Sequence, residues 1–581
     1  MTARSASLGA QLLGIERVRR LYRQLPSGLP PAEFARLGLE SLGVTFATGH
    51  LDVEQIPPAG SVVLVANHPF GAIEGLFLIW LAWRRRPDVR VVANDWLGEL
   101  AAIADLILPI DPFGRSRSVS SNALSLRRAL RWTERGGALI VFPAGEVSHF
   151  QPAHGCVMDP DWSPTMARLI RKTGAPVVPV HFSGHNSAAF QLAGLVHERM
   201  RTALLAHEMF NKRGRQVQVR IGLPITASRI GAMTDDNALA SYLRMRTYAL
   251  ADTPPIAAHS AAQARPLAVA TAQPAADLER ELDGLDPGAR LVAAQDMSVY
   301  CAAGSRIPRL LQEIGRLREL TFRAAGAGTG RALDIDLFDN YYDHLFLWSH
   351  PLRRVVGAYR LGRADRIVAR FGERGLYTST QFGFRLGFIS SLGTALELGR
   401  SFVRVEHQRE YGAMHLLWKG IGEYVRRDLR YHKLFGAVSI GNDYGRVSQA
   451  SLVEFLRRRH GDSRRARFVR SLHPVSAPAT LRPLFASLAR CRNVDEVSAL
   501  IADLEPDGKG VPVLIRNYLR LGGRILGFNR DPGFSDSIDC LLLMDLKDTE
   551  PHLLQRYVGS DGVAAIQGRQ PITVRQLARR A

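Results

Sequence analysis

His68 and Glu74 are the first residues of this chain with the types and the spacing of an acid–base pair. They follow the apolar run 61–66 across the turn 69–71, so the sequence predicts a buried strand that ends at the histidine. A histidine removes a proton from an alcohol near neutral pH, and a carboxylate on its other ring nitrogen fixes the tautomer and the direction of the ring. The alternative is a capped strand end with a surface glutamate, and the spacing alone weighs the two about equally.

Three further short signals follow within the next 120 residues. The segment 109–118 is a basic turn after an apolar run, 139–148 is a strand that ends in a Pro/Gly turn with an acid, and 175–184 is a buried strand with a proline near its middle. With the block around His68, this order resembles the four blocks of the glycerolipid acyltransferases of the PlsC type, over roughly residues 40–230. The resemblance implies an α/β fold and transfer of an acyl chain to a hydroxyl.

The resemblance also assigns roles to individual residues. His68 is expected to activate the acceptor hydroxyl while Glu74 orients the imidazole. The pocket for the acceptor's anionic head is expected to be formed by Arg115, Arg117, Gly145 and Glu146, with an ordinary solvated turn as the alternative for the two arginines. The chain departs from the family pattern because the first acid lies one position farther from the histidine and Ala144 stands where the third block usually has its acid. These departures leave the identity of the acceptor open.

Size and composition limit the classes of protein to consider. At 581 residues the chain is too long for one core, and 46% hydrophobic against 22% charged residues is typical of globular domains. No apolar run is long enough for a membrane-spanning helix, and the run 76–83 is either an interfacial helix or a helix packed beside the active site. Four cysteines without CxxC spacing, and histidines without ligand partners, argue against a disulfide framework and a metal site.

The formal net charge of +21 favours an acidic partner. Nucleic acid is the weakest candidate because no helix-turn-helix, RNP-like or zinc-finger pattern accompanies the charge, which leaves an anionic membrane surface and acyl carrier protein. Residues 1–23 are predicted to form a basic amphipathic helix that lies on a membrane. We therefore expect a cytoplasmic protein that is peripheral on the inner face of the cell membrane.

An Ala- and Pro-rich stretch divides the chain. Residues 251–288 predict a linker, since their composition buries too little apolar surface to order the segment. Residues 1–250 alternate buried strands with amphipathic helices, which predicts an α/β sheet with crossover connections. Residues 289–581 are expected to form a second domain, with helices at 307–322 and 413–429 and strands at 345–348, 354–361 and 375–381.

Acids and arginines are the informative residues of the second domain: Asp334, Asp336, Asp339, Arg360, Glu397 and Arg400. Their order resembles the acyl-homoserine lactone synthases and, more closely, the ornithine N-acyltransferases of the GNAT superfamily, over roughly residues 300–545. The resemblance implies a GNAT-like α+β fold that acylates an amine from a thioester. Such a reaction needs a group that accepts the ammonium proton and a way to screen the carbonyl oxygen.

The acids and arginines have two interpretations. In the catalytic one, Glu397 is the base or orients it, and Arg360 and Arg400 hold carboxylates. The three aspartates are then expected to bind the second ammonium of a basic amino acid such as ornithine. In the structural one, the same side chains form an ion-pair network that pins the acidic loop to the sheet.

Together the two domains predict consecutive steps of ornithine lipid synthesis. The C-terminal domain would join a 3-hydroxyacyl chain from acyl carrier protein to the α-amine of ornithine, and the N-terminal domain would acylate the hydroxyl of that lyso-lipid. No cofactor is expected beyond the acyl donor, for which acyl-coenzyme A is the alternative. Two other functions stay open: a lysophosphatidate-type acyltransferase fused to an N-acyltransferase for another amino acid such as glutamine, and a non-catalytic scaffold that binds a membrane or nucleic acid through its charge.

Overall fold

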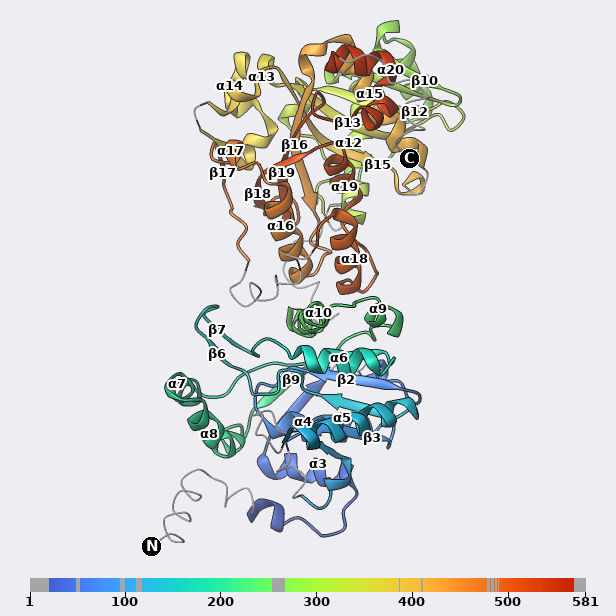
Figure 1. Ribbon diagram of the computed structural model, residues 1–581. Coiled ribbons are helices and arrows are strands. Elements are labelled where there is room, and N and C mark those ends of the chain that lie inside the picture. Colours follow the sequence, from blue (N-terminus) through green and yellow to red (C-terminus); the bar gives the residue numbers. More distant parts are fainter. Residues whose placement is uncertain are drawn as a thin grey trace, which may run out of the picture. The chain divides into compact units, whose positions relative to one another are not determined.

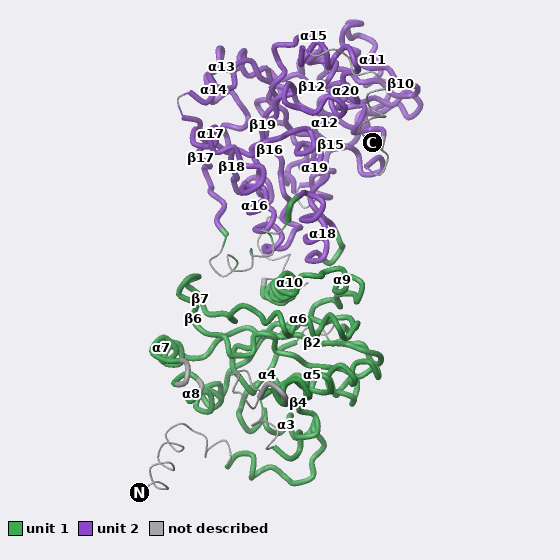
Figure 2. Tube along the Cα trace, viewed as in Figure 1, with its two compact units in different colours: residues 1–259, 477–492, 506–508 green, residues 260–476, 493–505, 509–581 purple. Residues whose placement is uncertain are grey.

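The computed structural model describes residues 20–48, 53–94, 100–110, 118–252, 267–325, 327–385, 387–408, 411–477 and 491–568, together with Leu481, Phe485 and Leu488. The chain forms two compact units (Figure 2). Unit 1 comprises residues 1–259, 477–492 and 506–508, and unit 2 comprises residues 260–476, 493–505 and 509–581. Within the described ranges, every helix is too short or too polar to cross a bilayer.

The centre of unit 1 is a seven-stranded sheet of order β1-β9-β8-β2-β5-β3-β4 (Figure 1). The last five strands of that order run parallel to one another, and β9 and β1 run antiparallel to them. The strands are β1 (Thr45–Thr48), β2 (Val62–Ala66), β3 (Val89–Ala93), β4 (Ile107–Pro109), β5 (Ala138–Val141), β8 (Val177–Phe182) and β9 (Gln216–Ile221), and a separate hairpin joins β6 (His149–Gln151) to β7 (Cys156–Met158).

Helices cover both faces of this sheet (Figure 1). They are α3 (Pro31–Leu42), α4 (Ala72–Trp83), α5 (Ser118–Glu134), α6 (Pro164–Lys172), α7 (Ala188–Val196), α8 (Glu198–Phe210), α9 (Ala227–Gly231) and α10 (Asp236–Ala249). All five residues of β2 are buried, as expected for a parallel strand that is covered on both sides. The apolar run 76–83 lies in α4, whose side chains join the main core cluster of the unit. The run is therefore a core helix beside the candidate active site, one of the two alternatives left open above.

Unit 2 contains an eight-stranded sheet of order β10-β11-β12-β13-β15-β16-β19-β18. Its strands are β10 (Arg290–Ala294), β11 (Met297–Ala303), β12 (Asp343–Ser349), β13 (Arg354–Arg363), β15 (Ala395–Val403), β16 (Lys433–Ile440), β18 (Arg524–Asp531) and β19 (Ser537–Asp545). All neighbours are antiparallel except β15 and β16, which run parallel and pair only over 395–397 with 433–435. Beyond Glu397 and Phe435 the two strands separate, which leaves an opening in the middle of the sheet.

Helices cover both faces of the second sheet. They are α11 (Ala275–Asp283), α12 (Pro308–Ala324), α13 (Ala364–Phe371), α14 (Phe388–Leu392), α15 (Tyr411–Arg427), α16 (Arg446–His460), α17 (Ser463–Ala466), α18 (Val494–Leu504), α19 (Val513–Arg520) and α20 (Pro551–Gln567), and a short hairpin pairs β14 (Phe382–Phe384) with β17 (Val469–Ser471). On β12, Phe346 packs with α12 while its neighbour Leu345 faces Gly420 of α15, so these two helices lie on opposite faces.

Most elements predicted for unit 2 are observed near their expected places. The helix predicted at 307–322 is α12, the helix predicted at 413–429 is α15, and the strands at 345–348 and 354–361 lie within β12 and β13. The strand predicted at 375–381 is wrong. That segment instead forms two 3₁₀ turns, η9 (Glu373–Gly375) and η10 (Tyr377–Thr380), because the carboxylate of Glu397 takes the N–H groups that a strand would offer to a neighbour.

The predicted linker is wrong over its second half, where residues 275–283 form α11. Leu278 and Leu282 stand four residues apart on this helix and are 2% and 8% exposed, because they pack into the cluster of α12. Asp277 and Glu281 of the same helix also accept hydrogen bonds from the first turn of α12, so apolar and polar contacts together hold the segment. Residues 253–266 of the predicted linker, and residues 1–19 of the predicted amphipathic helix, lie outside the described residues.

Candidate active sites

Three of the four blocks predicted in unit 1 follow neighbouring strands. β2, which precedes His68, lies between β5 and β8 and runs parallel to both. The carboxyl ends of parallel strands meet at one edge of the sheet, where α/β proteins bind their ligands. Asn67 fixes this edge, because its amide donates to the carbonyl of Phe182 at 2.9 Å and accepts from the N–H of Phe182 at 2.7 Å. The histidine therefore leaves the sheet at a fixed point.

His68 and Glu74 lie close together, although the imidazole Nδ1 forms no hydrogen bond with any described residue. Nδ1 of the imidazole lies 3.6 Å from Oε1 of the carboxylate, which is fully buried, whereas the imidazole is 19% exposed. Oε1 also accepts from the N–H groups of Phe70 and Gly71 at 2.6 and 3.3 Å and so caps α4. Gly71 has a φ of +115°, a backbone conformation open to glycine, and this turn accommodates the additional residue between the histidine and the acid. Nε2 is left as the ring nitrogen that can face a substrate.

Asp159 is part of this site, and sequence reasoning missed it. Its fully buried carboxylate accepts from the backbone N–H of His68 at 3.1 Å, from Ser148 Oγ at 2.5 Å and from Trp162 Nε1 at 2.9 Å. Burial raises the pKa of this carboxyl above its ordinary value. The aspartate thereby ties the histidine to the third block. No local sequence pattern predicts the contact of Asp159 with His68, because the two residues lie 91 positions apart in the sequence.

Of the other predicted pocket residues of unit 1, the structure describes Gly145 and Glu146. Gly145 follows β5 in a left-handed turn with a φ of +72°. Glu146 is 42% exposed and forms an ion pair with Arg201 of α8, which is buried. The ring of Phe142, which begins this turn, lies 4.5 Å from the ring of His68, so the third block borders the histidine. Arg115 and Arg117 lie outside the described residues.

In unit 2, a β-bulge brings Glu397 and Arg400 to the same face of the sheet. Arg360 of β13 pairs with Gly399 and Ala358 with Phe402, so Arg400 and Ser401 together stand opposite one residue. Arg400 has a φ of +50°, in the left-handed region. Strict alternation would place residues three apart on opposite faces. Both instead reach Tyr377, whose N–H donates to Glu397 at 3.2 Å and whose ring centre lies 4.8 Å from Cζ of Arg400.

Glu397 is 1% exposed and surrounded by donors. Its carboxylate accepts from the hydroxyl of Tyr342, from the N–H of Tyr377 and from the N–H of Thr378 at 2.6 Å. Burial raises the pKa of Glu397, although these hydrogen bonds act in the opposite direction. Three of its roughly four lone-pair directions are therefore taken, and the side chain holds η10 against β15.

The three predicted aspartates face three arginines. Asp339 accepts from Arg318 Nη1 at 2.8 Å and from Arg360 Nη1 at 3.2 Å, and Asp336 accepts from Arg360 Nη1 at 2.6 Å. Arg400 lies 3.4 Å from Asp334 and 3.6 Å from Asp336. Burial alone would raise the pKa of Asp339, but the charges of Arg318 and Arg360 outweigh it and hold that pKa below its ordinary value. Arg318 of α12 is the member that sequence reasoning missed.

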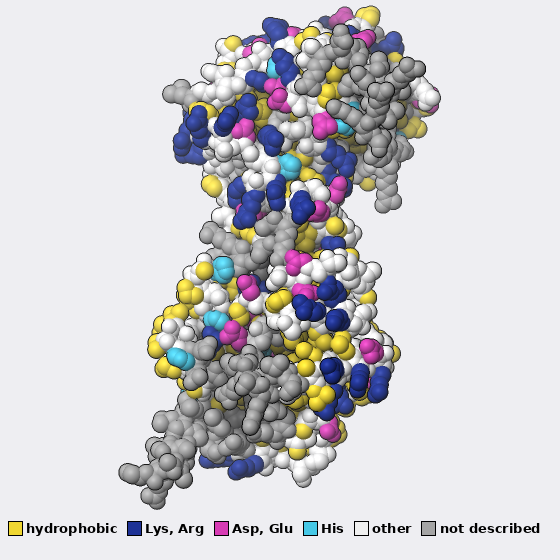
Figure 3. All heavy atoms as spheres, viewed as in Figure 1, with side chains coloured by type: hydrophobic (Ala, Val, Ile, Leu, Met, Phe, Trp, Pro, Cys, Tyr) yellow, Lys and Arg dark blue, Asp and Glu magenta, His cyan; other side chains and the backbone are white. Residues whose placement is uncertain are grey.

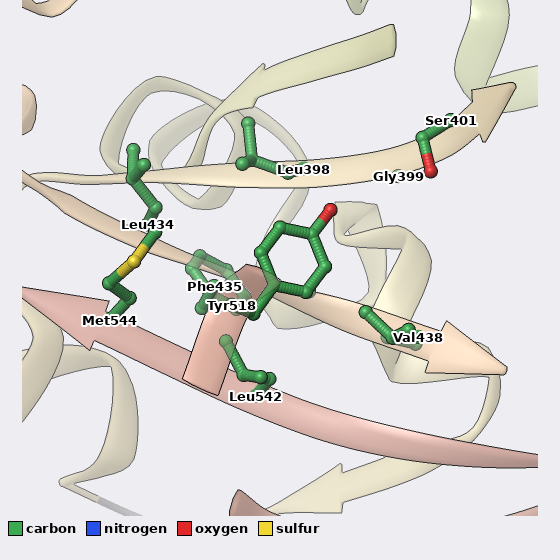
Figure 4. A pocket seen from close by; sticks show the side chains of 11 residues that line it. Leu398, Gly399, Ser401, Leu434, Phe435, Val438, Tyr518, Leu542 and Met544 are labelled. Atoms are coloured by element: carbon green, nitrogen blue, oxygen red, sulfur yellow. The ribbon is translucent and has the colours of Figure 1, made fainter. Parts of the chain in front are cut away.

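A pocket lies where β15 and β16 separate. It is lined by Leu398, Gly399, Ser401, Leu434, Phe435, Gly436, Ala437, Val438, Tyr518, Leu542 and Met544. Figure 4 shows the ring of Tyr518, from α19, between the diverging strands. The lining is apolar except for the hydroxyls of Ser401 and Tyr518 and the backbone. Among the described residues, no three His, Cys, Asp or Glu side chains are placed to hold a metal ion.

Two family models match separate parts of the chain. A family model described as "Acyltransferase" matches residues 14–255, and one described as "Acetyltransferase (GNAT) domain" matches residues 317–419. The chain is 29% identical over 297 residues to a glycine N(alpha)-acyltransferase of Bacteroides thetaiotaomicron, and this match covers 47% of the present chain and 85% of that protein. It is 32% identical over 184 residues to a lyso-glycine lipid O-acyltransferase of Phocaeicola vulgatus, and this match covers 30% of the present chain and 62% of that protein.

Among solved structures, the chain is similar to the 1-acyl-sn-glycerophosphate acyltransferase PlsC of Thermotoga maritima, with 19% identity and a TM-score of 0.24. The match covers 37% of this chain and 73% of that chain. The predicted α/β class with two different acyltransferase folds is confirmed. Residues 14–255 of the chain thus match an acyltransferase family, and residues 317–419 match a GNAT domain.

Proposed function

We propose that this chain makes an amino lipid in two consecutive acylations. The GNAT domain acylates the α-amine of an amino acid, and the N-terminal region then esterifies a hydroxyl of the resulting lyso-lipid. The observation that carries the proposal is that one chain is similar both to an amino-acid N(alpha)-acyltransferase and to a lyso-amino-lipid O-acyltransferase. The product of the first reaction is the acceptor of the second, which gives a reason for their fusion.

For the ester-forming step, the contact between His68 and Glu74 supports general base catalysis. Nε2 of His68 takes the proton of the lyso-lipid hydroxyl as its oxygen attacks the carbonyl carbon of an acyl thioester. The C–S bond then breaks, and the imidazolium returns its proton to the leaving sulfur. Glu74 holds the ring and stabilises its positive charge, and Asp159 holds the backbone of the histidine. Acid–base assistance of this kind typically contributes about 10²–10⁴ in rate.

For the amide-forming step, the opening between β15 and β16 supports entry of the thioester arm. We propose that the acyl carbonyl lies at the bulge near Gly399 and that Arg400 holds the carboxylate of the amino acid. Glu397 is then a positioning residue, since its carboxylate is engaged by three donors. The donor is proposed to be acyl carrier protein, whose acidic surface complements the net charge of +21, with acyl-coenzyme A as the competitor.

The head group is proposed to be an amino acid with a single ammonium, glycine being the one named for the relatives. The expected binding of a second ammonium by Asp334, Asp336 and Asp339 is weakened because three arginines already balance those charges. Ornithine therefore becomes the competitor. Arg318, Arg360 and Arg400 would have to release an acid before a cationic side chain could replace them.

Membrane association is proposed from the surface of unit 1. Leu192, Leu195 and Val196 of α7 are 63%, 54% and 75% exposed, and hydrophobic side chains gather over α7 and α8 (Figure 3). Residues at this spacing share one face of the helix, and α8 carries Arg201, the partner of Glu146 in the third block. An apolar helix face beside a site that handles lipid chains suits a peripheral position on a bilayer.

Lipid mass spectrometry tests the proposal. The chain is expressed in a host that makes no amino lipids, and the lipids are compared for wild type, His68→Ala and Glu397→Gln. We expect wild type to make a diacylated glycine lipid, His68→Ala to accumulate only the monoacylated form, and Glu397→Gln to reduce both. A diacylated ornithine lipid in place of the glycine lipid would overturn the head group. Formation of diacylated phosphatidate without any amino lipid would overturn the function.

A further inference from the structure

Two carboxylates of unit 2 have no cationic partner among the described residues. Asp539 of β19 is 1% exposed and accepts from Ser439 Oγ at 2.5 Å and from Gln381 Nε2 at 2.5 Å. Asp531 of β18 accepts from the same Nε2 at 3.1 Å and from the N–H of Gly533 at 2.9 Å. Two negative charges thus share one neutral amide, unlike the acids of the arginine network, where each charge is paired.

Gln381 adds a third oxygen to this cluster. Its side chain is buried, and because Nε2 bridges the two carboxylates, Oε1 is the atom that remains; it has no hydrogen-bond partner. A buried acceptor without a donor is costly in a folded protein. Three oxygen-bearing groups with excess negative charge and an unused acceptor match a ligand that carries positive charge and donates several hydrogen bonds. A primary ammonium has this chemistry.

The cluster stands opposite Arg400 across the opening in the sheet. Asp539 pairs with Ser439, which lies on β16 beyond the point of separation at Phe435, and Arg400 lies on β15 beyond Glu397. The turn η10 joins the two sides: Tyr377 at its start packs on Arg400, and Gln381 just after its end bridges Asp539 and Asp531. The charge of Arg400 also acts on Asp539. Arg400 Nε has no hydrogen-bond partner within the described part of the chain, so one side of the opening offers a guanidinium donor and the other offers carboxylates, as an amino acid requires.

We propose that Asp539, Asp531 and Gln381 form the subsite for the α-ammonium of the amino-acid acceptor and that Asp539 accepts its proton. The proposal rests on the proposed N-acylation and adds the residues that select and activate the amine. The ammonium binds between the three side chains while Arg400 holds the carboxylate of the same molecule. This assigns the amine to a cluster other than the aspartates near residue 336.

The proton and electron pairs balance without a further reactant. The carboxylate of Asp539 takes one proton from the ammonium, and the freed nitrogen lone pair attacks the carbonyl carbon of the thioester. The N–C bond forms, the C–S bond breaks, and a second nitrogen proton neutralises the leaving thiolate. Burial raises the pKa of Asp539 to about 7, which suits a base near neutral pH. The other charged or titratable groups around it are Asp531 on β18, Arg400 on β15, Tyr377 on η10 and its neighbour Cys540 on β19.

Steady-state kinetics with the full chain tests the subsite, using acyl carrier protein loaded with a 3-hydroxyacyl chain and glycine. Asp539→Asn keeps the volume, and its amide oxygen can accept from Gln381 Nε2 while its NH₂ group donates to the hydroxyl of Ser439, so Gln381 also keeps its bond to Asp531. We expect kcat/KM for glycine to fall about 10- to 100-fold, with the KM for the acyl donor unchanged. The rise of kcat/KM with pH around 7 should also disappear. Asp531→Asn should raise the KM for glycine several-fold with little change in kcat.

Asp536→Asn is the matched control, since Asp536 lies on the exposed turn before the same strand and pairs with Arg530. Its kinetics should equal wild type. Asp539→Asn with a kcat/KM within about twofold of wild type and an unchanged pH profile would overturn the subsite while leaving N-acylation standing. If wild type acylates no amino acid, the proposed function fails instead, and calorimetric binding decides the subsite: glycine that binds wild type and Asp539→Asn equally overturns it, and binding lost in the variant supports it.

Discussion

Replacing Asp539 by asparagine should make the stability of unit 2 less dependent on pH. The native carboxyl has a pKa of about 7 because burial disfavours its charged form, whereas the ordinary value is 3.8. Between these values the folded chain holds a proton that the unfolded chain has released, so the free energy of unfolding falls as pH rises through this window. Above it, both states are ionised and the dependence ends. The asparagine variant has no such group.

The magnitude follows from the interval between the two pKa values. About three pH units at 1.36 kcal/mol each give about 4 kcal/mol for the whole window. Between pH 5 and pH 8, the stability of wild type relative to Asp539→Asn should fall by about 3 kcal/mol. The variant should therefore be the more stable protein at pH 8, because a buried charge without a cation has been replaced by a neutral amide of the same shape.

Hydrogen exchange of peptides from β19 measures this effect. The opening free energy of this strand is read at pH 5, 6, 7 and 8 for both proteins, and the intrinsic exchange rates cancel in the comparison. The method does not require the two units to unfold as one, which a chain of this size rarely does. Asp536→Asn, on an exposed turn, should track wild type at every pH. A difference between wild type and Asp539→Asn that stays constant within about 0.5 kcal/mol from pH 5 to 8 would refute the reasoning.

Three further substitutions test other features. Gly436→Ala places a Cβ 2.0 Å from the carbonyl oxygen of Leu398, so thermal unfolding should show a loss of stability above about 2 kcal/mol. In the control Gly399→Ala the new Cβ meets nothing within 4 Å, and the loss should be about 1 kcal/mol or less. Equal losses in the two variants would contradict this. Glu74→Gln keeps the helix cap but removes the charge, and should lower the rate of O-acylation about 100-fold without changing N-acylation. Asp159→Asn should lower O-acylation about tenfold, since Trp162 loses its acceptor; unchanged rates contradict it.

The sequence predicted those strands, helices and contacts that depend on residues close together in the chain. The apolar run before His68 is a buried strand, and the acid six positions later returns to the imidazole, since a tight turn and the first turn of a helix bring such residues together. The helices α12 and α15 followed from their periodic apolar residues. In each case the pattern and the contact lie within a few turns of chain.

The residues that were missed depend on contacts distant in sequence. Asp159 and Arg318 are buried polar side chains whose partners come from other elements, and neither stands in a recognisable pattern. Asp539 sits in an apolar run that predicts a strand, so its isolation from cations becomes visible only when β16, β18 and β19 are assembled. The turn η10 was predicted as a strand because its alternation resembles one, while the carboxylate that shapes it lies 20 residues farther along the chain.

Because Arg400 of β15 is in the left-handed region, the number of residues in this strand decides on which face of the sheet the functional side chains lie. Deleting Ser401 would restore regular pleating and send the guanidinium of Arg400 to the side of the sheet where Leu398 and Tyr518 lie. The carboxylate of Glu397 and the guanidinium of Arg400 would then lie on opposite faces of the sheet, although both side chains were still present. In relatives of this chain, the number of residues across that short stretch is therefore as informative about activity as their identity.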